Sequence, residues 1–153
     1  MSAVDTVKDF MIALEAKEFD TAANYLSADF VFSGWTPQPL DREQFLTVMR
    51  ELKAGLPNLS YHFHAVKNVL DLEQEDSVNG GIQVTGTQTD GFVLPPLGLP
   101  PIPQMEGTVS LPEELWSYTL QGDKIARIMV HRVPGGGIQG LLHQLGVDVP
   151  FIQ

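Results

Sequence analysis

Apolar side chains recur every three or four residues at the start of the chain, and this spacing predicts an amphipathic helix. The positions concerned are Val4, Val7, Phe10, Met11 and Leu14. The apolar face of such a helix needs a partner to cover it, so we expect this helix to pack on a larger element.

Two more helices are expected before residue 55. A short one covers about residues 21–26, with Asp20 as a plausible N-cap. A longer one begins after Asp41 and runs to about Ala54. Asp41 is followed three residues later by Gln44, which is the spacing of a capping box.

The pattern then changes from helical spacing to alternation, which predicts strands. A short strand ends near Gly34, and longer strands are expected over residues 59–76, 77–92, 108–121 and 124–133. Gly80 and Gly81 loosen the second of these and are typical of a bulge. A short amphipathic helix over residues 138–145 follows the last strand.

Helices followed by mostly adjacent strands predict an α+β fold with an antiparallel sheet, because a doubly wound fold would alternate the two. The length of 153 residues fits one domain, which we place at residues 1–153.

Composition narrows the partners and compartments. The formal charge is −10, from 9 basic and 19 acidic side chains, which disfavours nucleic acid and anionic membrane surfaces. There is no cysteine, which excludes disulfides and thiol chemistry. No signal peptide or membrane span is recognisable, so we expect a cytoplasmic protein.

Gly135, Gly137 and Gly140 match the dinucleotide-binding pattern G-x-G-x-x-G after a strand-like run. That motif needs a further parallel strand and an acidic residue about 20 positions later. Only 13 residues follow Gly140, so we reject nucleotide binding and interpret the glycines as a sharp reversal before the last helix.

Histidines are the first candidates for chemistry. His62 and His64 lie two apart on a predicted strand and would share a face, but a metal site needs more ligands, so we predict no metal. His131 lies in the last strand, both faces of which look buried. It is either a core histidine bonded to a carbonyl or a general base near neutral pH.

The segment 92–103, FVLPPLGLPPIP, holds five prolines and otherwise almost only apolar residues. Proline removes backbone donors, so this segment cannot enter a helix or a sheet interior. We expect it to pack on the fold as a rigid connection or to form the rim of a cavity.

Three stretches together resemble the SnoaL-like polyketide cyclases, within the nuclear transport factor 2-like superfamily. They are VKDFMIALEAKEFDTAANYLSADFVFSG, GTQTDGF followed by LPP, and GDKIARI followed by GLLHQLG. The resemblance implies a cone in which three helices wrap a curved antiparallel sheet around a cavity. It also implies a homodimer formed through the sheet and ring closure without metal or organic cofactor.

The sequence departs from this family where the family's chemistry lies. Gln88 stands at the histidine of the G-T-H-T pattern, and the last strand reads MVHRVP where the family keeps an acid. No carboxylate occurs between Asp123 and Asp148. His131 would then be the acid–base and Gln88 the group that orients a carbonyl.

We therefore expect an apolar pocket for a small molecule, lined by Trp35, Trp116, Tyr118 and Met129. The first hypothesis is a cofactor-free cyclase, isomerase or hydrolase acting on a carbonyl-bearing substrate. The alternative is a ligand-binding or protein-interaction module that has lost the family's aspartate and its chemistry.

Overall fold

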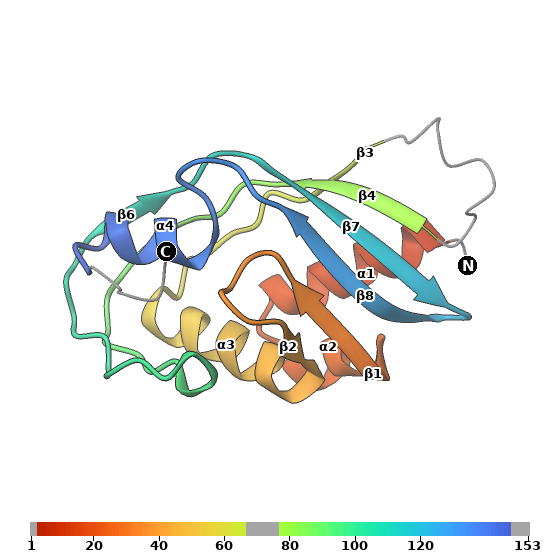
Figure 1. Ribbon diagram of the computed structural model, residues 1–153, viewed down its shortest axis with the longest axis horizontal. Helices are drawn as coiled ribbons and strands as arrows, with labels where there is room; N and C mark the ends of the chain where they lie inside the picture. The colour runs from red at the N-terminus through yellow and green to blue at the C-terminus, as the bar shows by residue number, and fades with distance from the viewer. Residues whose placement is uncertain (1–2, 67–76, 148–153) are drawn as a thin grey trace.

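The computed structural model describes residues 3–66 and 77–147. In them, helices α1 (Ala3–Glu15), α2 (Phe19–Ala23) and α3 (Arg42–Gly55) lie against one side of a curved sheet (Figure 1). The six-stranded sheet has the order β2-β1-β8-β7-β4-β3. Its strands are β1 (Leu26–Ser33), β2 (Leu40–Asp41), β3 (His64–Val66), β4 (Ser77–Ile82), β7 (Glu114–Gln121) and β8 (Lys124–His131).

Two further strands adjoin the large sheet in the chain order, β5 (Thr85–Thr87) after β4 and β6 (Thr108–Ser110) before β7. They pair with each other as a small second sheet, and η1 (Pro95–Leu97) and α4 (Gly137–Gln144) complete the fold. The strand pairs in the described residues are antiparallel except β1 with β8, which is parallel. The predicted α+β class and curved sheet with three N-terminal helices are confirmed.

Helix α3 begins as the sequence predicts. Asp41 accepts a hydrogen bond from the Gln44 backbone N–H, and the Gln44 side chain accepts one from the Asp41 N–H, both at 2.9 Å. The prediction for α2 was wrong at both ends. Its N-cap is Glu18 rather than Asp20, without a side-chain hydrogen bond, and Leu26 belongs to β1 because it is buried beside β8.

Gly80 and Gly81 do not mark a bulge, contrary to the expectation from their position in a strand. Their pairing with Trp116 and Leu115 on β7 is regular. A Cβ at Gly80 would lie 2.4 Å from the ring of Phe63. The glycines thus make room for side chains of the neighbouring segment. Of the predicted strand 59–76, the structure shows β3, and residues 67–76 lie outside the described ranges.

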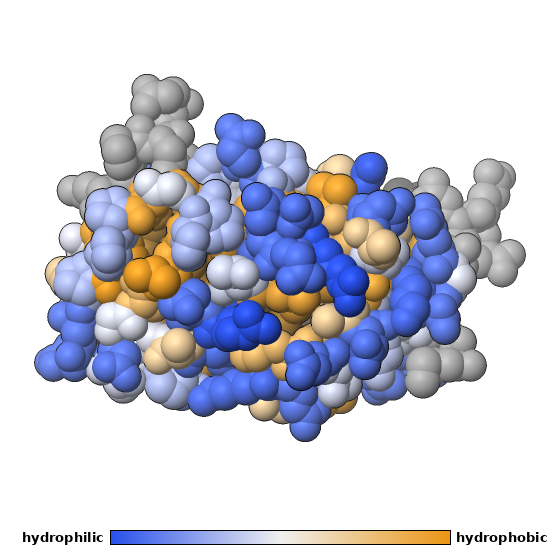
Figure 2. Space-filling model, turned by 90° about the horizontal axis from the view of Figure 1, so that it is seen from below, coloured by the Kyte–Doolittle hydropathy of each residue, from blue (hydrophilic) through white to orange (hydrophobic). Residues whose placement is uncertain are grey.

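The core lies between the helices and the concave face of the sheet. Side chains alternate along β7, so that Trp116, Tyr118 and Leu120 point inward. The helical side presents a mostly hydrophilic surface with hydrophobic patches between polar side chains (Figure 2). None of the described helices is long and apolar enough to cross a membrane.

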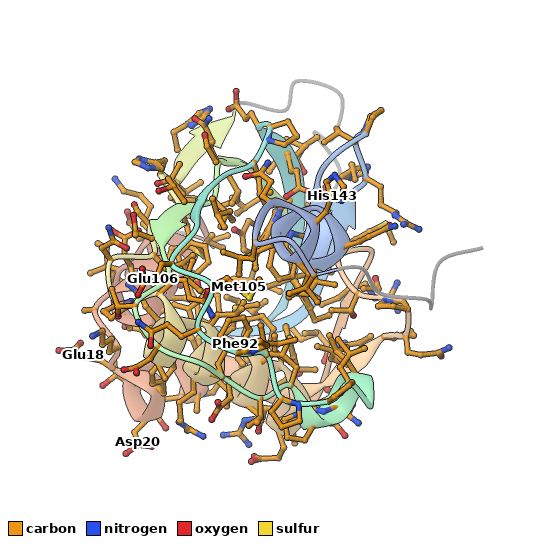
Figure 3. The ribbon with its side chains drawn as sticks, turned by 90° about the vertical axis from the view of Figure 1, so that its left-hand side faces the viewer. Glu18, Asp20, Phe92, Met105, Glu106 and His143 are labelled. Atoms are coloured by element: carbon orange, nitrogen blue, oxygen red, sulfur yellow. The ribbon has the colours of Figure 1, made fainter. Side chains whose placement is uncertain are left out.

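One end of the molecule is closed by the proline-rich segment and α4. Figure 3 looks onto this end, where Phe92 and Met105 mark the chain that crosses it and His143 marks α4. Phe92 and Ile102 are buried and pair through their backbones. The proline-rich segment therefore packs on the fold, which was one of the two expectations for it.

Candidate functional site

The chain carries a deeply buried carboxylate at the first residue of β7. Glu114 follows the bend between β6 and β7 and is 2% exposed. Its Oε1 accepts a hydrogen bond of 3.0 Å from the indole N–H of Trp35, and its Oε2 accepts one of 3.1 Å from the backbone N–H of Gly137. Glu114 thus links the loop after β1, the start of β7 and the start of α4.

The glycine run is shaped around this carboxylate. A Cβ at Gly136 would lie 2.6 Å from Glu114 Oε2, so no larger residue fits there without displacing the side chain. Gly137 has a φ of 74°, a conformation that glycine adopts at little cost. The glycine run that resembles a nucleotide-binding motif therefore packs against the Glu114 carboxylate of the same chain.

Burial raises the pKa of Glu114, and the hydrogen bonds from Trp35 and Gly137 lower it by less. The balance leaves the carboxyl easier to protonate than an exposed glutamate. A carboxylate offers about four lone-pair positions, and these two N–H donors take two of them. Each oxygen therefore keeps one lone-pair position on which a proton could lie.

Two surface hollows lie near Glu114, and Glu114 itself lines the second of them. The first, here called the glycine-loop pocket, is about 170 Å³ and is lined by Trp35 and residues 132–139 among others. The second, the strand-end pocket, is about 340 Å³ and is lined by Glu114, His131 and Arg132, among others. Arg132 borders both pockets, so they are neighbours at one edge of the fold.

Behind Trp35 lies a cluster of buried rings. Trp35 contacts Trp116 with ring centroids 6.4 Å apart, and Trp116 contacts Tyr118 at the same distance. Trp116 Nε1 and the Tyr118 hydroxyl have no hydrogen-bond partner among the described residues. An unsatisfied buried donor costs about 1–3 kcal/mol, so these groups would gain by meeting a polar ligand atom.

His131 does not lie where the sequence suggested. Only one face of β8 is buried, and Ile128 and Val130 lie on it. His131 and Met129 lie on the opposite, exposed face. The expectation that both faces are buried was wrong, because in the part of the chain that the structure describes the helices cover one side of the sheet (Figure 1). His131 Nε2 lies 2.9 Å from the Ser117 hydroxyl oxygen.

Gln88 is buried, with 1% exposure, but its amide is used within the fold. The side-chain N–H₂ donates to the carbonyl of Pro103 at 2.8 Å, and Oε1 accepts from the Met105 backbone N–H at 2.7 Å. Gln88 therefore clips the end of the proline-rich segment. A role in orienting a substrate carbonyl stays a prediction.

The other predicted pocket residues fall into two groups. Trp35, Trp116 and Tyr118 come together in the buried ring cluster, whereas Met129 is 42% exposed on the outer face of the sheet. The sequence interpretation missed Glu114. The available signal was its alternation with Trp116 and Tyr118 in ELWSY, which places the carboxylate on the same face as those rings.

His62 and His64 do not share a strand face. His62 precedes β3 with a φ of 47° and its Nε2 lies 2.9 Å from the Thr85 hydroxyl. His64 Nε2 lies 3.0 Å from Glu113 Oε2 at the surface. Within residues 3–66 and 77–147 no group of three or more histidine or acidic side chains is arranged to hold a metal ion.

Comparison with known proteins places the fold. No protein-family model and no curated protein sequence matches the chain. Among solved structures, a SnoaL-like polyketide cyclase from Agrobacterium tumefaciens has a TM-score of 0.61 at 13% identity, covering 89% of this chain and 94% of that one.

Two further structures extend the comparison. AclR from Streptomyces galilaeus, whose proposed activity is that of a hydroxylase, has a TM-score of 0.69 at 15% identity, with 94% and 95% of the two chains covered. An NTF2-like protein of unknown function from Cytophaga hutchinsonii has a TM-score of 0.57 at 16% identity, with 88% and 92% covered. The chain thus has the fold of the SnoaL-like proteins in the nuclear transport factor 2-like superfamily, which confirms the resemblance seen in its sequence.

Proposed function

We propose that the protein is a cofactor-free acid–base enzyme of the cyclase or isomerase type, acting on a small carbonyl compound, with Glu114 as the proton carrier. The observation that carries the proposal is Glu114 itself, a buried carboxylate with a raised pKa that lines the strand-end pocket, while its donors Trp35 and Gly137 line the glycine-loop pocket. Catalytic carboxyls are tuned in this way, because a pKa closer to neutrality serves both proton removal and proton return.

The chemistry follows from the position of this group. The Glu114 carboxylate removes a proton from the carbon next to the carbonyl, and the C–H electron pair forms the double bond of an enolate. In an isomerisation the protonated Glu114 returns the proton to another carbon. In a ring closure the enolate carbon attacks a second carbonyl, and Glu114 protonates the resulting alkoxide.

The unpaired N–H of Trp116 and hydroxyl of Tyr118 support this chemistry as donors to a developing oxyanion. Burial raises the pKa of the Tyr118 hydroxyl, which keeps it protonated and able to donate at neutral pH. These donors lie in the ring cluster that Trp35 joins to Glu114. Both side chains are fully buried and line neither pocket, so this role requires the substrate to open the ring cluster when it binds.

The test uses exchange of carbon-bound hydrogen, which needs no knowledge of the complete reaction. Wild-type protein in D₂O is incubated with 4-acetylbenzoate, 4-acetylbenzamide and 2-tetralone, and loss of the α-proton signals is followed by NMR. We expect exchange above the buffer rate and a decrease of about 10²- to 10⁴-fold in Glu114→Gln. Glu43→Gln, at an exposed position that lines neither pocket, should exchange like wild type. No exchange by wild type, or full activity in Glu114→Gln, overturns the proposal.

A non-catalytic binding module is the second candidate, and a specific observation favours it. Both oxygens of Glu114 are already held by protein N–H groups, which is also how a structural carboxylate would anchor α4. This candidate predicts saturable binding of such carbonyl compounds without exchange, so the same experiment separates the two.

A further inference from the structure

Arg132 occupies a distinct place beside the candidate site. It follows the last residue of β8 and lines both the glycine-loop pocket and the strand-end pocket. It is exposed, and it forms no ion pair in the part of the chain that the structure describes. A guanidinium at the border of two hollows is placed to receive an anionic group from either.

The charges around Arg132 limit which anion would fit. Glu114 and Glu113 line the strand-end pocket with it, and the whole chain carries a formal charge of −10. Glu113 is turned to His64, whose Nε2 lies 3.0 Å away. The guanidinium fork can pair with either a carboxylate or a phosphate. Repulsion from the pocket carboxylates grows with the charge of the ligand, so a monoanionic carboxylate fits better here than a dianionic phosphate ester.

We propose that Arg132 is a specificity-determining residue, which binds a carboxylate on the substrate and holds its carbonyl portion toward Glu114. This inference rests on the proposed function, because it assigns the substrate class of the same site. The substrate would be a small oxo-acid that carries its carboxylate away from the reacting carbon. Binding energy from that remote carboxylate would orient the reacting atoms.

Binding can be measured separately from turnover, since both tryptophans of the chain can report on the site. Trp35 lines the glycine-loop pocket, and Trp116 packs against Trp35. Quenching of their fluorescence is titrated with 4-acetylbenzoate, 4-acetylbenzamide and 4-acetylphenyl phosphate. We expect wild type to bind the carboxylate about tenfold more tightly than the amide, the scale of a charge-assisted hydrogen bond. The ratio should fall to near one in Arg132→Gln and be partly kept in Arg132→Lys.

Arg127→Gln is the matched control, because Arg127 is an exposed arginine on β8, the strand that Arg132 follows, and lines neither pocket. It should keep the wild-type ratio. Equal binding of carboxylate and amide by wild type, no binding of the carboxylate, tighter binding of the phosphate, or an unchanged ratio in Arg132→Gln would each overturn the inference. Glu114→Gln should lose exchange while its ratio stays at or above that of wild type, because the variant removes a carboxylate that repels the ligand. Failure of the Arg132 assignment and failure of the proposed function therefore give different results.

Discussion

The indole N–H of Trp35 donates a 3.0 Å hydrogen bond to Oε1 of Glu114, joining residues 79 positions apart in the chain. Both partners are buried, so the bond acts in a medium of low polarity where its effect on the carboxyl is large. It favours the ionised form and so opposes the effect of burial on the pKa of Glu114. Trp35 therefore partly offsets the effect of burial and widens the pH range in which Glu114 is ionised.

Replacing Trp35 by phenylalanine should move that range. Trp35→Phe removes the N–H donor and keeps an aromatic ring, so the pKa of Glu114 rises further. If Glu114 acts as the base, the acid limb of the pH–rate profile for exchange shifts to higher pH. The profile is measured with 4-acetylbenzoate in buffers of constant ionic strength. A profile that stays in place would show that this bond does not tune the reacting group.

Glu114 should also make the free energy of unfolding depend on pH, in the direction opposite to that of most carboxyl groups. Its pKa is raised in the native state, so between the ordinary value of about 4.3 and the raised value the native state holds a proton that the unfolded state has lost. The stabilising contribution of Glu114 is complete below the ordinary glutamate pKa. It is lost as the pH rises through the raised pKa of the native state.

The corresponding measurement compares wild type with Glu114→Gln in urea unfolding across that pH range. Wild type should lose stability relative to Glu114→Gln as pH rises, because the variant has no charge to bury. Glu113→Gln should follow the wild-type trend on this account. Parallel curves for wild type and Glu114→Gln would contradict the raised pKa.

Gln88 should matter for stability more than for chemistry. Gln88→Ala leaves the Pro103 carbonyl and the Met105 N–H without their buried partner, which should cost about 2–4 kcal/mol of unfolding free energy. Exchange per folded molecule should stay near the wild-type rate. Gln83→Ala, at an exposed position nearby, is the control in chemical unfolding. A large loss of exchange at unchanged stability would instead support the orienting role predicted from the sequence.

The sequence predicted the elements well because each rests on local patterns. Helical spacing located α1 and α3, and Asp41 with Gln44 predicted a capping box that the structure contains. The short α2 was placed less well, since five residues carry little periodicity. Its boundary is decided by burial of Leu26 beside β8, a contact between residues far apart in the chain.

The candidate site could be predicted only in part. Alternation put Trp116 and Tyr118 on one face, and it placed Glu114 there as well, but a glutamate at a strand start is most often exposed. Its burial depends on Trp35 and Gly137, which no local pattern connects to it. For β8 the sequence was ambiguous, because Met129 made the outer face look as apolar as the inner one.

His131 offers a direct test of the role that the sequence first assigned to it. The side chain is exposed on the outer side of the sheet, although it also lines the strand-end pocket. With Glu114 as the proton carrier, His131→Ala should change the exchange rate by less than about threefold, against the 10²- to 10⁴-fold typical of losing a general base. Ser117→Ala removes the side-chain partner of His131 and should change the exchange rate equally little. A decrease of several powers of ten in His131→Ala, with Glu114→Gln active, would return the role to the histidine.

The outer face of the sheet provides the last prediction, the homodimer that the family resemblance implies. Met129 is 42% exposed at the middle of this face, in register with Ser33 on β1 and Ser117 on β7. If two copies pair through this face, Met129→Glu puts a charge into a desolvated contact and should convert dimer to monomer in sedimentation. Thr89→Glu adds the same charge at an exposed position outside the sheet and should stay dimeric. A monomeric wild type, or a dimer that tolerates Met129→Glu, would exclude this face as the interface.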